Sequence, residues 1–119
     1  MDYSDQELHR LAMTTAGKKL ENKNFEFLAI NSELKKMPQY VAKKDGQLSF
    51  IIVKHVLYPN DPEKYDTIWM ETMKAHAKEK DARLYFIGVG FANSDDMDKR
   101  PNKNNDVLIK FSGKIERVL

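Results

Sequence analysis

The chain contains no cysteine. This absence excludes disulfide bonds, thiolate nucleophiles, and zinc or iron–sulfur sites that depend on cysteine ligands. Long hydrophobic runs are also missing, since no stretch approaches the roughly 20 apolar residues that a membrane-spanning helix needs. The first residues are acidic and carry no apolar run, so they do not resemble a secretory signal. We therefore expect a cytoplasmic protein that has no membrane partner.

Glycine is scarce, with five in 119 residues, and a nucleotide-binding loop has one candidate, the pair Gly88 and Gly90. The third glycine of a dinucleotide fingerprint is absent because Asn93 stands in its place, and no capped helix follows. Three histidines lack metal-ligand spacing and are each interpreted as satisfied structural residues: His9, His55 and His76. The sequence therefore predicts no cofactor and no metal site.

What is present is a globular composition, with 41% hydrophobic and 32% charged residues. That balance favours one folded domain over residues 1–119 rather than a disordered chain. Lys and Arg number 20 against 18 Asp and Glu, and the isoelectric point of about 8.7 is lower than expected for a dedicated nucleic-acid binder. Basic pairs are interleaved with acids and predict a mixed surface: Lys18-Lys19, Lys35-Lys36, Lys43-Lys44 and Lys99-Arg100.

The N-terminal half is expected to form one helix and three strands. Ser4 and Glu7 have the spacing of a capping box, which places the start of a helix near Ser4. Asp45-Gly46 is a strong hairpin signal between two strand-like runs. The expected elements are a helix over 4–22 and strands over 25–31, 40–43 and 48–56, with a polar connection at 32–36. The last of these strands is the most apolar and is expected at the centre of the sheet.

The C-terminal half is expected to add one helix and two strands. Asp61-Pro62 and Asp66 are alternative starts for the helix, which ends near Lys80. The helix face that is predicted to pack carries Trp69, Met73, His76 and Ala77. Trp69 is interpreted as core rather than as part of a binding platform. The remaining elements are a strand over 83–92, a polar loop over 93–105, a strand over 107–111 and a charged tail.

The order α-β-β-β-α-β-β contains the core arrangement of the PD-(D/E)XK restriction-endonuclease-like superfamily, which this chain resembles. The resemblance covers about residues 4–92 and centres on the stretch MPQYVAKKDGQLSFIIVK. It implies an α/β fold in which a mixed central sheet is flanked by helices. The family's second strand carries Pro-Asp, matched here by Pro38 and Gln39, and its third strand carries Glu-x-Lys, matched by Ile52 and Lys54.

The resemblance places the former active site at four positions: Met13, Gln39, Ile52 and Lys54. In the family, carboxylates at the first three positions hold Mg²⁺ beside the scissile phosphate, and the lysine positions or activates the attacking water. Methionine, glutamine and isoleucine supply no anionic oxygen for a hard cation. The resemblance therefore implies the fold and argues against metal-dependent cleavage, and no catalytic residue is assigned.

Two of these side chains have alternative roles. Lys54 is expected either to extend to solvent or to pair with a new carboxylate, with Glu21 and Glu26 as candidates, because a buried unpaired ammonium is costly. It is also the candidate for binding an anion. Gln39 is interpreted as a polar residue at the sheet edge, with a hydrogen bond to a base or to backbone as the alternative.

Three functions remain open at this stage. The first is a non-catalytic binding or interaction protein, and the second is a nucleic-acid-binding relic that uses Lys54 and the basic pairs on phosphates. The third is a nuclease whose acids have migrated, with Glu26, Glu33, Asp45 and Glu71 as candidates. The sequence does not identify a partner, and a homodimer through a free sheet edge is a further alternative.

Overall fold

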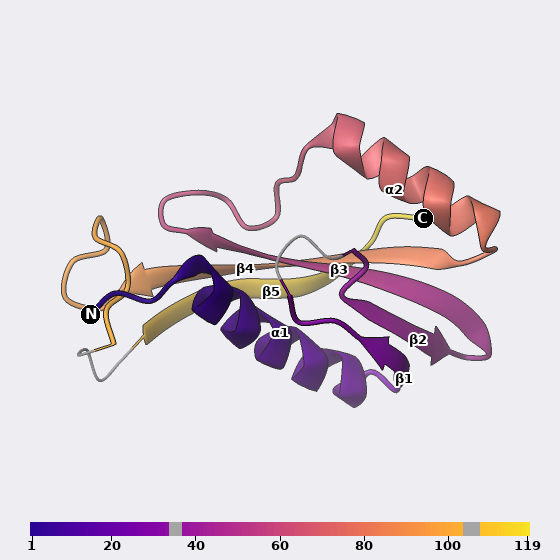
Figure 1. The fold of residues 1–119 in the computed structure, drawn as a ribbon, viewed down its shortest axis with the longest axis horizontal. Helices are drawn as coiled ribbons and strands as arrows, with labels where there is room; N and C mark the ends of the chain where they lie inside the picture. The colour runs from indigo at the N-terminus through magenta and orange to yellow at the C-terminus, as the bar shows by residue number, and fades with distance from the viewer. Residues whose placement is uncertain (34–36, 104–107) are drawn as a thin grey trace.

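The computed structural model of the chain is an α/β domain with one helix on each face of a central sheet (Figure 1). It describes residues 1–33, 37–103 and 108–119, without the side chains of residues 108 and 109. In these residues five strands form one sheet in the order β1-β2-β3-β4-β5, with β3 and β4 parallel and the other neighbours antiparallel. The predicted α/β class, mixed sheet and element order are confirmed.

The elements are short at the N-terminal edge of the sheet and long at its centre. Helix α1 spans Asp5–Asn22 and helix α2 spans Thr67–Glu79. The strands are β1 Glu26–Ile30, β2 Tyr40–Lys44, β3 Gln47–Leu57, β4 Arg83–Asn93 and β5 Leu108–Arg117. Residues 34–36 of the predicted connection, 104–105 of the predicted loop and 107 of the predicted last strand lie outside the described residues.

Helix α1 begins as its capping box predicts. The Ser4 hydroxyl accepts a hydrogen bond from the Glu7 backbone N–H (3.1 Å), and the Glu7 carboxylate accepts one from the Ser4 N–H (3.0 Å). Two backbone donors of the first turn are thereby satisfied. The buried stripe of α1 packs on one sheet face, against residues that include Ile51, Val53, Ile87 and Val89.

The opposite face of the sheet is covered by α2. Asp66 is the N-cap, since its Oδ1 accepts hydrogen bonds from the N–H groups of Ile68 (2.9 Å) and Trp69 (3.1 Å), so the later of the two predicted starts is the correct one. The predicted packing face needs correction. Met70 and Ala77, two turns apart, are the buried residues of α2, whereas Trp69 and Met73 are half-buried and His76 is exposed.

The hairpin between β2 and β3 has the predicted turn. Asp45 (φ 52°) and Gly46 (φ 77°) both have positive φ, as a two-residue hairpin loop requires, and Lys44 pairs with Gln47. Leu48, Phe50 and Ile52 all face α2. The predicted hairpin is therefore confirmed.

The last strand differs from its prediction, because β5 continues to Arg117 instead of ending in a charged tail. Ser112 (φ 66°) and Gly113 (φ 96°) form an irregularity inside the strand, where its register against β4 shifts. A bulge therefore stands where the strand was expected to end, and the charged residues beyond it belong to an edge strand. Of the described helices, neither is long and apolar enough to cross a membrane.

Candidate functional site

A cavity of about 370 Å³ opens beside the longer strand β3, at the N-terminal end of β2. Tyr40, the first residue of β2, pairs with Ile51, so residues 52–57 of β3 extend beyond the β2 ladder and leave a notch in the sheet. Walls come from both faces of the sheet and from the segment before β2. The lining residues are His9, Met37, Gln39, Val53, Lys54, His55 and Trp69. We call this site the Lys54 cavity.

Gln39 extends the β2–β3 ladder with its side chain. It is fully buried, and its Oε1 accepts a hydrogen bond from the Val53 backbone N–H at 2.7 Å. Its Nε2 donates to the Met37 sulfur at 2.9 Å. The interpretation of Gln39 as an edge residue is therefore wrong, and the alternative of a backbone hydrogen bond is confirmed. The side chain satisfies a buried donor for which β2 is too short.

Lys54 makes a contact that the sequence interpretation did not include. Its Nζ lies 4.2 Å from the centroid of the Trp69 ring, in a cation–π contact worth about 0.5–2 kcal/mol. Within the described part of the chain, no Asp or Glu oxygen lies within 4.0 Å of this Nζ, so neither Glu21 nor Glu26 is its partner. The ring attracts the ammonium without neutralising its charge.

Trp69 has both a packing role and a place in the cavity. One side of the half-buried indole packs against the core under α2, and the residue also lines the Lys54 cavity. Its interpretation as core alone is therefore wrong. The helical spacing of apolar residues predicted the packing face of α2 approximately. It could not predict that the Trp69 indole contacts Lys54 on β3.

His9 is the site residue whose chemistry the sequence interpretation missed. The side chain comes from α1 and is 2% exposed, and its Nε2 has no hydrogen-bond partner among the described residues. The described residues therefore do not supply the partner that a satisfied structural histidine needs. Burial lowers the pKa of His9, and the nearby His55, whose ring centroid lies 6.2 Å away, lowers it further. The ring is therefore neutral near pH 7.

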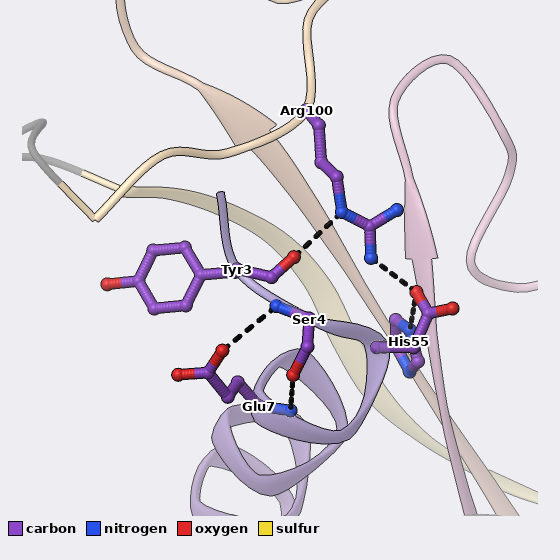
Figure 2. A network of polar contacts seen from close by, with 6 residues as sticks. Tyr3, Ser4, Glu7, His55 and Arg100 are labelled. Atoms are coloured by element: carbon purple, nitrogen blue, oxygen red, sulfur yellow. Dashed lines mark hydrogen bonds and ion pairs between the residues drawn. The ribbon is translucent and has the colours of Figure 1, made fainter. Parts of the chain in front are cut away.

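His55 belongs to a polar network that joins α1 to the loop after β4 (Figure 2). The Asp5 carboxylate lies 3.4 Å from His55 Nε2 and 2.6 Å from an Arg100 guanidinium nitrogen, and Arg100 Nε donates to the Tyr3 carbonyl at 2.7 Å. Hydrogen bonds from Arg100 and then His55 lower the pKa of Asp5. Burial lowers the pKa of His55, although Asp5 opposes that shift. The network fixes the His55 wall of the cavity.

Acidification from about pH 7.5 to about pH 5.5 is expected to lower the melting temperature. The pKa values of His9 and His55 in the folded state lie below the ordinary histidine value of 6.5, so the unfolded chain binds more protons just below that value. The stability from the two neutral rings is therefore complete above about pH 6.5 and is lost as the pH falls through it. Thermal unfolding followed by circular dichroism measures this. The substitution His9→Leu should flatten the dependence, and a constant wild-type melting temperature over this range would contradict it.

The four positions of the former active site do not come together in one place. Gln39 and Lys54 line the Lys54 cavity, and Ile52 lies fully buried under α2 beside a second cavity of about 250 Å³. Met13 is 4% exposed and packs under α1, on the opposite face of the sheet from Ile52. The resemblance implies one site for these positions, and the structure separates Met13 from Ile52.

The acids proposed for a migrated active site are dispersed. Glu26 and Glu33 are exposed at β1 and after it, Asp45 lies in the hairpin turn, and Glu71 pairs with Lys74 on α2 (3.1 Å). Over residues 1–33, 37–103 and 108–119, no group of three or more histidine, aspartate or glutamate side chains could hold a metal ion. The described geometry therefore gives none of these acids a place beside Lys54.

The fold and this site define a small α/β domain with a cationic, partly aromatic cavity at a notch in its sheet. The chain belongs to the family described as Domain of unknown function (DUF8840), whose model matches residues 6–117. Neither a curated protein nor a solved structure matches the chain.

Proposed function

We propose that this chain is a non-catalytic, restriction-endonuclease-like binding protein of the cytoplasm, and that the Lys54 cavity is its binding site. The observation that carries the proposal is an ammonium held over an indole ring inside a cavity, without a carboxylate within 4.0 Å in the described residues. Such a cation attracts a negatively charged group into a site that is walled by polar and aromatic side chains.

The residues at positions 39 and 52, two of the three carboxylate positions of the family, support the absence of catalysis. The side-chain oxygen at position 39 is engaged by the Val53 N–H, and position 52 is apolar and fully buried under α2. A metal-dependent nuclease needs anionic oxygens at both places to hold Mg²⁺. The observed sheet order and the parallel β3–β4 pair are compatible with the proposed fold family.

Incubation of the purified protein with plasmid DNA, single-stranded DNA or RNA in Mg²⁺ or Mn²⁺ is expected to leave all three substrates intact. The reason is that residues 39 and 52 offer no ligand that holds a hard cation. Gel electrophoresis after incubation measures cleavage, and the matched variant is Lys54→Ala. Cleavage by the wild-type protein that disappears in Lys54→Ala would overturn the non-catalytic proposal.

A second candidate function is nucleic-acid binding, which a different surface favours. Two adjoining hollows between α1 and β5 share Lys19, and no acidic residue from the described part of the chain lines them. Their basic side chains are Lys18, Lys19, Lys23, Lys110 and Lys114. Lysines gathered along one track suit a phosphate backbone. Retarded migration of uncut nucleic acid in the same gels, abolished by added salt, would favour this candidate.

A further inference from the structure

The charged residues that line the Lys54 cavity limit the charge of the ligand that it can bind. Lys54 supplies the permanent cation among the lining residues. His9 and His55 have lowered pKa values and are neutral near pH 7, and Asp5 is already engaged by Arg100 and His55. Counted over the described residues, the cavity therefore offers one positive charge. A monoanion matches this charge, whereas a phosphate dianion would bring a second charge that no described lining residue neutralises.

The buried His9 ring supplies a second, independent requirement for a ligand. Its Nε2 has no partner in the described residues, although buried polar atoms are rarely left without one. A neutral imidazole can carry its proton on Nε2 and donate it to an oxygen, beside the charge-assisted hydrogen bond that an ammonium donates. A carboxylate has two oxygens, one for each donor.

The remaining walls indicate the body of the ligand. Met37 and the Trp69 indole provide apolar and aromatic surface, and the volume of about 370 Å³ is at the lower end for small-molecule sites. Apolar surface is buried favourably against such walls, and a flat ring can stack on the indole. These walls suit a compact molecule with one polar end.

From these observations we infer that the Lys54 cavity binds a small organic monocarboxylate, with its carboxylate on Lys54 Nζ and His9 Nε2 and its apolar body against Met37 and Trp69. This inference rests on the proposed binding function of the same cavity and adds the chemical class of its ligand.

Trp69 makes the test direct, because it is the only tryptophan of the chain and it lines the cavity. Its emission is followed while the wild-type protein is titrated at constant ionic strength with benzoate, with benzamide or with inorganic phosphate. Benzoate should give a saturable change. Benzamide has the same shape without the charge and should give none, and phosphate should bind at least about tenfold more weakly than benzoate.

Substitutions of Lys54 and His9 test whether each of these side chains contacts the bound benzoate. Lys54→Met keeps the length of the side chain without its charge and should weaken benzoate binding about tenfold or more, whereas the exposed control Lys43→Met should bind as the wild type does. His9→Leu should weaken benzoate about fivefold and leave the melting temperature of the free protein unchanged or raised, because an unpaired buried nitrogen is removed. A merely structural His9 would instead give a lower melting temperature with unchanged binding.

Several results would overturn the inference. They are no saturable change with benzoate in the wild type, equal binding of benzamide, tighter binding of phosphate, or unchanged benzoate affinity in Lys54→Met. The wild-type titrations need no variant, so the inference can fail even if Lys54→Met does not fold. The nuclease assays test the proposed absence of catalysis separately. Cleavage of nucleic acid in those assays would contradict that proposal without changing the result of the benzoate titrations.

Discussion

Replacing Gly88 with alanine is expected to destabilise the protein by about 3 kcal/mol or more. Gly88 lies in β4, where the loop between β3 and α2 passes over the strand, and a Cβ at this position would overlap the Pro62 carbonyl group. Pro62 is buried, and its loop leads to Tyr65, whose ring packs 4.9 Å from that of Phe86, and to the cap of α2. The Pro62 carbonyl is part of the backbone and cannot rotate away from the new Cβ as a side chain could, so the loop that contains Pro62 must move.

Gly90→Ala is the matched control, two residues along the same strand. Its Cβ would meet the ring of Phe111, a half-buried side chain on β5 that can shift. We expect a smaller loss, of about 1–2 kcal/mol. Urea denaturation of both variants gives the two free energies of unfolding. Equal losses in the two variants, or a wild-type midpoint for Gly88→Ala, would show that the loop does not press on β4.

Gln39→Leu is expected to cost about 2–3 kcal/mol of the free energy of unfolding. The amide oxygen of Gln39 is the acceptor for the Val53 N–H, and leucine would leave this buried donor unpaired. Urea denaturation measures the loss, and hydrogen exchange of the Val53 amide reports the broken hydrogen bond directly. Val53 exchange should become faster by more than the global loss of stability alone explains.

The control for this substitution is Gln47→Leu. Gln47 is half-buried at the other end of the hairpin, and its side chain donates to the Asp81 carbonyl at 2.7 Å. That carbonyl belongs to an exposed residue, so water can replace the lost donor and the expected change is within about 0.5–1 kcal/mol. Similar losses in the two variants, or an unchanged Val53 exchange rate in Gln39→Leu, would refute the role assigned to Gln39.

The parts of the fold that local signals specify were predictable from the sequence. The Asp45-Gly46 turn fixes the β2–β3 register, and the Ser4–Glu7 spacing fixes the start of α1. The end of β5 was not predictable in this way. Ser112 and Gly113 are typical of a strand terminator, and only pairing with β4, distant in sequence, shows that the strand continues past them.

The candidate site was predictable only in part, for a similar reason. Lys54 and Gln39 came from the family resemblance, but the burial of Gln39 depends on β2 being shorter than β3, which the polarity pattern does not record. His9 reaches the cavity from α1. Trp69 reaches Lys54 because α2 covers the sheet face on which Lys54 lies. Such contacts arise from tertiary packing, and the spacing of residues in the sequence does not predict them.

The parallel pairing of β3 and β4 also has a consequence for the kinetics of folding. Ser49 pairs with Arg83 across the whole crossover that contains α2, and both helices pack on the surface that these two strands create. The β2–β3 hairpin can close within microseconds, but a hairpin alone is marginal in water. The rate-limiting search is therefore expected to be for this one pairing of high contact order, which creates the surfaces on which the two helices find their partners.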